Sequence, residues 1–360
     1  MSNIKTVNLV VFGIGKVGSV FVNQINALRQ QLFEERKLYL RVPIITNSKI
    51  AFFDKEGASN SWETDFELAA VPYKINDILK YKIQHNFQNC IAIDATASSS
   101  FVAHYKELVA HGFHIVSANK IANTLSLDFY EDLRSVLEKY DKKFLYETNV
   151  GAGLPVIETV SNLRHSGDEI TNIRGVFSGS LSYIFNDFSQ KNVSFSKVLQ
   201  KASQQGLTEP DVREDLSGND VARKLLILSR ELGFKTEIED VKIESLVPKK
   251  LNGKTTLNQF KSRIDELNTV FESRKKRLKN NQVLRYVGEL NVPNKTLEVK
   301  LIETSSTSPL GQLKGSDAFF EIYSKAYEKQ PLIIQGAGAG KEVTARGLLS
   351  DVLKVSNNLN

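Results

Sequence analysis

Three glycines directly after the first apolar run of the chain constrain its fold more than any other feature. Residues 7–12 are continuously apolar, as expected of a strand that is buried on both faces. The first glycine would make a tight turn, the second would let a ligand approach the backbone, and the third would let the next helix pack on the strand. This junction between a strand and a helix over residues 16–30 predicts a dinucleotide-binding turn made of Gly13, Ile14, Gly15, Lys16, Val17 and Gly18.

Strand and helix patterns alternate through the first ~145 residues, which predicts an α/β fold with a doubly wound parallel sheet of the Rossmann type. The expected strands cover residues 39–46, 50–54, 91–94, 113–116 and 144–146, and the expected helices cover 99–110 and 127–140. We therefore predict a dinucleotide-binding domain over residues 1–147.

The pattern changes after Glu147. Strands are expected over residues 170–177, 283–290 and 296–302, and the Val292-Pro293-Asn294 turn predicts that the last two form an antiparallel hairpin. Helices are expected over residues 193–204 and 219–232. These elements predict a second, α+β domain over residues 148–330, followed by a strand, a glycine loop and a helix (331–360) that return to the nucleotide domain.

Composition limits the class of protein. The chain of 360 residues has a net charge of +6 and a single cysteine, Cys90, so it forms no internal disulfide and suits a reducing, cytoplasmic compartment. No apolar stretch approaches the length of a membrane span and the N-terminus lacks a signal-peptide core, so no membrane partner is expected. The dense basic run at residues 274–277 continues a polar helical pattern, which favours a solvated helix face over nucleic-acid binding.

The end of the second strand bears on cofactor preference. The sequence Ile45-Thr46-Asn47-Ser48-Lys49 lacks the carboxylate that would bind the ribose hydroxyls of NAD. We therefore expect Asn47 and Ser48 to line a site that favours NADP, with use of NAD also possible. Lys16 would either meet a phosphate or lie in solvent, and its position alone does not decide.

Small and hydroxylated residues follow the fourth and fifth strands, at the sheet edge where ligands of open α/β folds bind. Lys120 would reach the nicotinamide or the substrate from this edge, although a surface lysine that begins a helix is an equal alternative. We predict that the cofactor contacts here are Thr96, Ser98, Ser117 and Lys120.

A loop rich in carboxylates opens the helix expected over residues 219–232. Asp220 and Lys224 are four residues apart and share a helix face, and Lys224 lies beside the apolar stripe. A partly buried ammonium held by a carboxylate suits an acid–base group or a clamp for a polar substrate. The alternative is an ordinary helix pair, worth a few tenths of a kcal/mol, roughly. The cluster, which includes Glu209 and Asp215, favours a functional site.

Most of the chain resembles homoserine dehydrogenase, and in particular the dehydrogenase half of fused aspartate kinase–homoserine dehydrogenases. The resemblance runs through residues 13–18, 117–124, 150–155, 177–184, 208–211, 215–224, 332–336 and 338–345. It implies reversible oxidation of L-homoserine to L-aspartate 4-semialdehyde with NAD or NADP, and a homodimer formed through the second domain. Because no kinase or regulatory segment flanks these motifs in the sequence, we expect weak or absent inhibition by threonine.

The resemblance also implies roles for single residues. Lys224 and Lys120 would manage the proton of the reacting oxygen, and Asp220 would orient Lys224 or the substrate. Glu209 would bind the substrate ammonium with support from Asp215, and Gly179 and Ser180 would lie near the substrate. Gly340 would lie near the cofactor, and a monovalent cation, expected to be sodium, would bind Glu147 and the carbonyls of Val150, Ala152 and Leu154. From the residues alone, that glycine-rich turn is equally a plain hinge.

Two residues depart from the family pattern. Leu207 stands where many members have a tyrosine, and Ser180 where they commonly have a threonine. A cofactor-binding sensor without turnover, or an oxidoreductase acting on another small amino or hydroxy acid, are therefore the alternatives. A thioester-forming aldehyde dehydrogenase is disfavoured because Cys90, the one candidate nucleophile, precedes a predicted buried strand.

Overall fold

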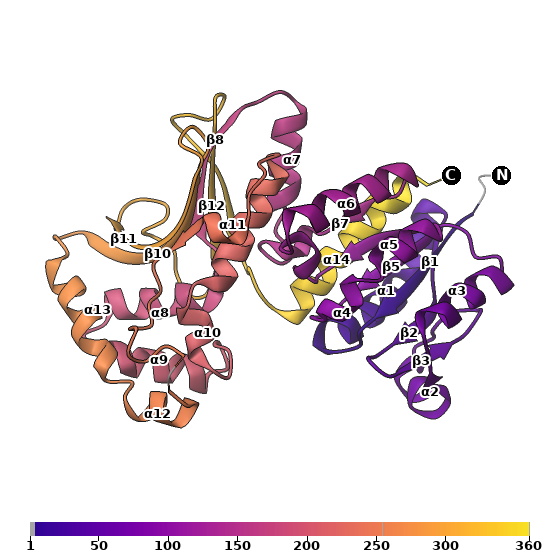
Figure 1. Ribbon diagram of the computed structural model, residues 1–360, viewed down its shortest axis with the longest axis horizontal. Helices are drawn as coiled ribbons and strands as arrows, with labels where there is room; N and C mark the ends of the chain where they lie inside the picture. The colour runs from indigo at the N-terminus through magenta and orange to yellow at the C-terminus, as the bar shows by residue number, and fades with distance from the viewer. Residues whose placement is uncertain (1–3, 254, 360) are drawn as a thin grey trace. The chain divides into compact units, whose positions relative to one another are not determined.

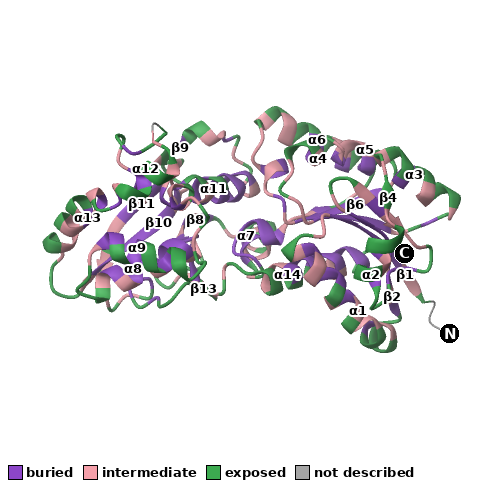
Figure 2. Cartoon of the chain, turned by 90° about the horizontal axis from the view of Figure 1, so that it is seen from below, coloured by how far each residue is buried: buried purple, intermediate pink, exposed green. Residues whose placement is uncertain are grey.

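The computed structural model describes residues 4–253 and 255–359, which form two compact units. The first unit contains the chain up to Gly153 and the segment from Gly340 onward, and the second contains Leu154–Ala339 (Figure 1). Each unit is built on one sheet, and the strands of both sheets are largely buried (Figure 2).

The first sheet has seven strands in the order β4-β3-β2-β1-β5-β6-β7. Strand β1 (Lys5–Phe12) is central and pairs in parallel with β2 (Leu38–Thr46) and β5 (Cys90–Asp94), and the parallel order continues through β6 (Phe113–Ser117) to β7 (Phe144–Leu145). This arrangement confirms the predicted α/β fold and brings the carboxyl ends of β1, β2, β5 and β6 to one edge.

The sheet is not wholly parallel, which differs from the prediction. Strand β3 (Ile50–Phe53) runs antiparallel to β2, and the short β4 (Val71–Pro72) runs antiparallel to β3. The physical reason is the short connection after β2, because three residues allow a hairpin and not the crossover that a parallel neighbour requires.

Helices cover both faces of the first sheet. Residues of α1 (Lys16–Arg36), α2 (Trp62–Ala69) and α14 (Lys341–Asn357) share one apolar core with β1. Residues of α3 (Ile75–Gln84), α5 (Tyr105–Ala110) and α6 (Leu127–Lys139) form the cores on the other face. Two layers of helices around one sheet are the doubly wound architecture that the sequence predicts.

The predicted helix over residues 99–110 is divided into α4 (Ser99–Val102) and α5. The break lets Phe101 pack on Phe12, with ring centroids 4.4 Å apart, while the Tyr105 hydroxyl reaches the Asp94 carboxylate at 2.7 Å. Cys90 lies inside β5 and is buried, and burial raises its pKa to about 12. A thiol in this state is a poor nucleophile.

The second unit has a six-stranded sheet in the order β13-β12-β8-β10-β11-β9. The predicted hairpin is present, because β10 (Gln282–Asn291) and β11 (Thr296–Ser305) pair antiparallel along their full lengths. The other strands are β8 (Ile170–Val176), β9 (Val241–Ile243), β12 (Ala318–Ser324) and β13 (Leu332–Gly336).

The helices of the second unit include two that pack on one face of this sheet, α8 (Gly179–Gln190) and α11 (Asn219–Glu231). Phe185 of α8 stacks on Tyr286, and Leu225 of α11 lies against Gly288. The remaining helices are α7 (Val156–His165), α9 (Phe195–Gln204), α10 (Val212–Leu216), α12 (Leu257–Ser262) and α13 (Glu266–Arg277).

The opposite face of the second sheet carries a row of charged side chains. The register aligns Glu298, Glu289, Arg174, Glu321 and Ile333 across five neighbouring strands. Arg174 pairs with Glu321 at 2.7 Å, and Lys300 pairs with Glu289 and Glu298 at 2.8 and 2.6 Å. Leu310 and Leu313 of a loop pack over the neighbouring part of this face.

The end of the chain differs in part from the expectation. Helix α14 packs against α1 in the first unit, as predicted for the returning segment. Strand β13 instead pairs antiparallel with β12 in the second sheet, because β12 has a free edge that a short connection reaches. The basic run at the end of α13 is also less solvated than expected, since Arg274 pairs with Glu244 and Lys275 donates to the carbonyls of Phe188 and Lys191.

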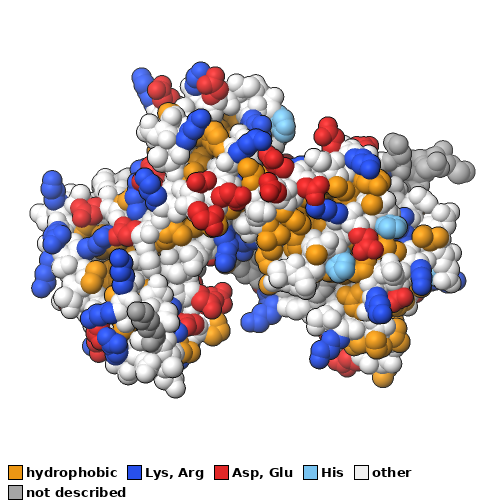
Figure 3. Space-filling view, viewed as in Figure 1, with side chains coloured by type: hydrophobic (Ala, Val, Ile, Leu, Met, Phe, Trp, Pro, Cys, Tyr) orange, Lys and Arg blue, Asp and Glu red, His pale blue; other side chains and the backbone are white. Residues whose placement is uncertain are grey.

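Two surface properties bear on possible partners. Among the described residues, no helix combines the length and apolarity that crossing a bilayer requires. On the face drawn in Figure 3, Lys and Arg side chains are interspersed with Asp and Glu.

Candidate active site

The glycine turn between β1 and α1 has the geometry expected of a dinucleotide site. Gly13 has φ +90°, and a Cβ there would lie 2.7 Å from Thr96. A Cβ on Gly18 would lie 1.9 Å from the Gly13 carbonyl oxygen, so this glycine sets the contact between helix and strand. A Cβ on Gly15 would meet no atom within 4 Å, which leaves open space beside the backbone. Each glycine thus occupies the position that its expected role requires.

The N-terminus of α1 is suited to an anion. Gly15 provides no side-chain cap and the first turn contains no acidic residue, so the partial positive charge of the helix end is not neutralised locally. Lys16 is exposed and Val17 is half-buried at this helix end.

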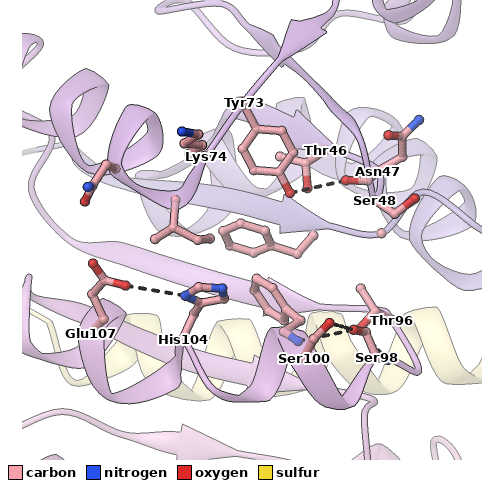
Figure 4. A pocket seen from close by; sticks show the side chains of 15 residues that line it. Thr46, Asn47, Ser48, Tyr73, Lys74, Thr96, Ser98, Ser100, His104 and Glu107 are labelled. Atoms are coloured by element: carbon pink, nitrogen blue, oxygen red, sulfur yellow. Dashed lines mark hydrogen bonds and ion pairs between the residues drawn. The ribbon is translucent and has the colours of Figure 1, made fainter.

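A cavity of about 560 Å³ begins at this turn and runs between the ends of β2 and β5 (Figure 4). Its lining includes Gly13, Asn47, Ser48, Thr96 and Ser98, five of the predicted cofactor residues. The lining also includes residues that the sequence did not identify, among them Tyr73, Lys74, Ile75, Phe101, His104 and Glu107.

Among the described residues that line this cavity, the carboxylate is Glu107 of α5, whereas Thr46, Asn47 and Ser48 at the end of β2 are uncharged. The Asn47 side-chain oxygen accepts the N–H groups of Lys49 and Ile50 at 2.8 and 2.9 Å, which shapes the turn into β3. The Tyr73 hydroxyl donates to the Asn47 carbonyl at 3.2 Å (Figure 4). Lys74 lines the same cavity and adds a cation that comes from the β4–α3 connection.

Two of the predicted cofactor residues at the end of β6, Ser117 and Lys120, differ in how far they are buried. Ser117 is fully buried, and its hydroxyl bonds Tyr105 and the Asn119 N–H at 2.8 and 3.0 Å. Ser117 was predicted to contact the cofactor, but its buried hydroxyl instead holds Tyr105 and the loop after β6 in place. Lys120 is half-buried and directly precedes the short 3-10 helix Ile121–Asn123.

The glycine-rich turn after β7 presents one buried carboxylate. Glu147 is 6% exposed, and its Oε2 lies 3.9 Å from the Lys354 ammonium of α14. Ala152 has φ +53° and Gly151 has φ +79°, a left-handed turn that rotates successive carbonyls. Among residues 4–253 and 255–359, no three His, Cys, Asp or Glu side chains come close enough to hold a metal ion, so a cation here would depend on carbonyl oxygens.

Lys224 of α11 has the environment predicted from the sequence. Its residue is 7% exposed, and its Nζ lies 2.8 Å from Asp220 Oδ2 and donates to the Phe177 carbonyl oxygen at 2.7 Å. Gly218, with φ +79°, precedes the helix, and a Cβ there would collide with the Tyr286 hydroxyl at 2.2 Å. The start of α11 is thus fixed, and with it the direction of Asp220 and Lys224.

A second cavity of about 300 Å³ lies at this helix start. Four carboxylates line it, Glu209, Glu214, Asp215 and Asp220, together with Arg223. Asp215 Oδ1 accepts from the Ser180 hydroxyl at 2.5 Å and Oδ2 accepts from the Glu209 N–H at 2.8 Å. Burial raises the pKa of Asp215, and the Ser180 hydrogen bond opposes that rise.

The structure thus brings together the residues predicted at the carboxylate loop and adds Glu214 and Arg223. Gly179 and Ser180 form the first turn of α8, and a Cβ on Gly179 would lie 2.9 Å from the Ser316 carbonyl oxygen. Leu207 is 36% exposed and contributes no polar group. Gly340 is the residue before α14 and has φ +130°, a conformation that favours glycine.

Comparison with known proteins identifies the family. The family model described as homoserine dehydrogenase matches residues 155–353, and the model for the NAD-binding domain of homoserine dehydrogenase matches residues 13–147. The bifunctional aspartokinase/homoserine dehydrogenase of Haemophilus influenzae is 37% identical over 355 residues, which are 98% of this chain and 43% of that protein. A chloroplastic relative of the same name from Zea mays is 37% identical over 97% of this chain and 38% of its own length. The chain therefore spans about two fifths of the length of these curated relatives.

Solved structures agree with the fold. A Candida auris protein described as of unknown function is 34% identical, with a TM-score of 0.90 over 98% of this chain and 99% of that chain. A hyperthermophilic archaeal homoserine dehydrogenase in complex with NADPH is 20% identical, with a TM-score of 0.74 over 99% of each chain, and supports the fold alone. Because the two family models together extend from residue 13 to residue 353, the chain belongs to the homoserine dehydrogenase family.

Proposed function

We propose that this chain catalyses the reversible, NADP-dependent oxidation of L-homoserine to L-aspartate 4-semialdehyde. The observation that carries the proposal is the buried Lys224 ammonium, which is held between the Phe177 carbonyl and Asp220, one of the four carboxylates that line the second cavity. When a hydride leaves the carbon of an alcohol, a nearby group must take the proton of the hydroxyl oxygen, and in the reverse reaction that group must return it. A lysine in such a position meets this requirement.

The cavity beside Lys224 suits an amino acid. Glu209 and Asp215 supply negative charge for the substrate ammonium, and the Ser180 hydroxyl keeps one oxygen of Asp215 in a fixed direction. Arg223 supplies the opposite charge for the substrate carboxylate. Lys120 is the second proposed proton group, and bound nicotinamide would accept or give the hydride.

NADP is the proposed cofactor. The absence of a carboxylate from the lining of the cavity near β2 supports this choice, because a carboxylate there would repel the 2′-phosphate. Ser48 and Lys74 line that region and would bind the phosphate, while Ile75 and Phe101 offer apolar surface to the adenine. Gly13, Gly15, Gly18 and the first turn of α1 would hold the pyrophosphate.

A monovalent cation, expected to be sodium, is proposed at the turn after β7. The donor set fits a hard cation of low charge, since it combines the Glu147 carboxylate with the carbonyls of Val150, Ala152 and Leu154. Lys354 already balances part of the Glu147 charge, which favours a single positive charge over a divalent ion.

We propose a homodimer that joins through the row of charged residues on the face of the second sheet opposite α8 and α11. The charges of Arg174, Glu321, Lys300 and Glu289 are paired within the row, which lowers the cost of covering them with a second copy. The reducing interior of the cell is the proposed location, which is consistent with a single buried cysteine.

The test is the absorbance of reduced nicotinamide with L-homoserine and either NADP or NAD. Turnover would establish the reaction, and a higher kcat/KM with NADP would support the assignment of Ser48 and Lys74. Binding of both cofactors without turnover would overturn the proposal and favour a sensor or another substrate. Leu207, which lacks the usual hydroxyl, is the specific feature behind that alternative.

A further inference from the structure

We propose that Asp94 and Asn119 form a clamp that positions Lys120 for the reaction. Asp94 lies at the end of β5, Asn119 follows β6, and both side chains are buried, at 0% and 2% exposure. Neither residue lines the described cavity, so the inference concerns positioning and not contact with a ligand. It rests on the proposed function and on the proposed role of Lys120.

The Asp94 carboxylate connects two loops of the site edge. Its Oδ1 accepts the Thr96 N–H at 2.8 Å, which fixes the loop that carries Thr96 and Ser98. Its Oδ2 accepts the Tyr105 hydroxyl at 2.7 Å and the Asn119 amide at 3.0 Å. One carboxylate thus holds the loop after β5 to the loop after β6.

Asn119 fixes the backbone on both sides of Lys120. Its amide nitrogen donates to Asp94 and to the Ser98 carbonyl oxygen, each at 3.0 Å. Its side-chain oxygen accepts the N–H of Ile121 at 3.1 Å, and its own N–H donates to the Ser117 hydroxyl at 3.0 Å. Because both neighbours of Lys120 are held, the direction in which this lysine leaves the backbone is held as well.

The charge state of Asp94 follows from its partners. The Thr96 N–H and the Asn119 amide are donors only, and the Tyr105 hydroxyl also donates to the carboxylate. Burial raises the pKa of Asp94, and the hydrogen bonds from Tyr105, Thr96 and Asn119, all of which the ionised carboxylate can accept, oppose that rise. An asparagine at position 94 would turn an amide group toward a donor and would break the clamp even though its shape is similar.

The same clamp links the predicted cofactor loop to Lys120. Thr96 and Ser98 line the large cavity, whereas Asn119 bonds the Ser98 carbonyl directly. A displacement of about 1 Å in a reacting group can cost on the order of 100-fold in rate. Loss of the clamp should therefore lower kcat through Lys120, while the fold and the glycine turn remain.

The first test is Asn119→Ala, measured as kcat with L-homoserine and NADP. We expect kcat to fall by about 10- to 100-fold, and amide hydrogen exchange in residues 117–124 to accelerate. Asn8→Ala is the matched control, because Asn8 is equally buried and bonds Gln88 and Arg41 within the same unit, away from the described cavity. Unchanged kcat and unchanged exchange in Asn119→Ala would overturn the clamp.

The second test separates positioning from general loss of stability. In a Lys120→Ala background, Asn119→Ala should change kcat by less than about twofold, since the group that the clamp positions is already absent. An equal further loss in that background would overturn the proposal. If Asn119→Ala does not fold, Tyr105→Phe takes its place in the same cycle, because it removes one hydroxyl and leaves the ring packing.

The third test exchanges the partners. Asp94→Asn and Asn119→Asp should each lower kcat, and the double variant Asp94→Asn/Asn119→Asp should be faster than Asn119→Asp alone, because an amide at position 94 again faces a carboxylate at position 119, while the Ser98 carbonyl lacks its donor in both. If the loss of kcat in the double variant equals the product of the losses in the two single variants, the proposed pairing of residues 94 and 119 is overturned. The hydrogen-exchange measurement needs no turnover, so a failed clamp is distinguishable from a failed assignment of the reaction.

Discussion

At the scale of single residues, Lys224 carries the most specific prediction. Lys224→Ala removes the proposed proton group, so kcat should fall by about 100- to 10,000-fold, which is the usual contribution of acid–base catalysis. Binding of NADPH, followed by its fluorescence, should change little because the cofactor residues lie in the other unit. Lys242→Ala, at an exposed lysine of the second unit, is the control. Normal turnover by Lys224→Ala would contradict the proposed role of Lys224 in proton transfer.

Asp215 gives the site a predictable dependence on pH. Only the ionised carboxylate attracts the substrate ammonium, so kcat/KM for L-homoserine should fall as the pH drops through the raised pKa of Asp215. Ser180→Ala removes a hydrogen bond that favours the ionised form, so the acidic limb of the profile should move to higher pH. Ser180→Thr keeps the hydroxyl and should keep the limb. If the acidic limb of the kcat/KM profile stays at the same pH in Ser180→Ala, the hydrogen bond from Ser180 to Asp215 does not have the proposed role.

Arg223 offers a test of substrate recognition. Arg223→Gln should raise KM for L-homoserine by about 10-fold or more, since a charge-assisted bond to the substrate carboxylate is lost. The activity with 3-aminopropan-1-ol, which lacks the carboxylate, should be the same in both proteins. Equal losses with the two substrates would show that Arg223 acts on the site in general and does not recognise the carboxylate.

Sequence patterns predicted residues whose role depends on local spacing. Lys224 and Asp220 are one helical turn apart, and the glycine turn is contiguous, so both could be found without a structure. Lys74 and the Asp94–Asn119 bond depend on separate segments meeting in space. Ser117 illustrates the limit, because its position at a strand end was correct but its hydroxyl points into the interior.

At the scale of elements, the glycine turn separates binding from stability. Gly15→Ala places a methyl group in open space at a negative φ, so the melting temperature should be retained while NADPH affinity falls by about tenfold or more. Gly18→Ala drives a Cβ into the Gly13 carbonyl and should destabilise the unit by about 1–3 kcal/mol. Thermal melts and NADPH titration of both variants test this. Unfolding of Gly15→Ala would contradict the assignment.

Elements with strong local signals were predicted, whereas the short edge strands β4 and β9 and the internal strand β12 were not. The continuous apolar run of β1 and the turn between β10 and β11 are local features, and both elements are present. Strand β12 is buried except at Tyr323 and has no alternating pattern, and β13 pairs with its free edge and not with the first sheet. The choice of sheet depends on which edge is open, which a single sequence does not reveal.

At the scale of the whole molecule, the second sheet predicts the state of assembly. The face opposite α8 and α11 carries charges that pair with one another, with Arg174 half-buried and Glu321 buried, and the row ends at Ile333, which is 45% exposed on the edge strand. Light scattering should therefore give twice the mass of one 40.3 kDa chain. Ile333→Asp would bury an unpaired charge in the proposed interface and should raise the dimer dissociation constant by about tenfold or more. Val193→Asp, at a comparably exposed residue between α8 and α9, should leave the dimer intact. A monomeric protein, or an equal effect of both variants, would exclude this face as the interface.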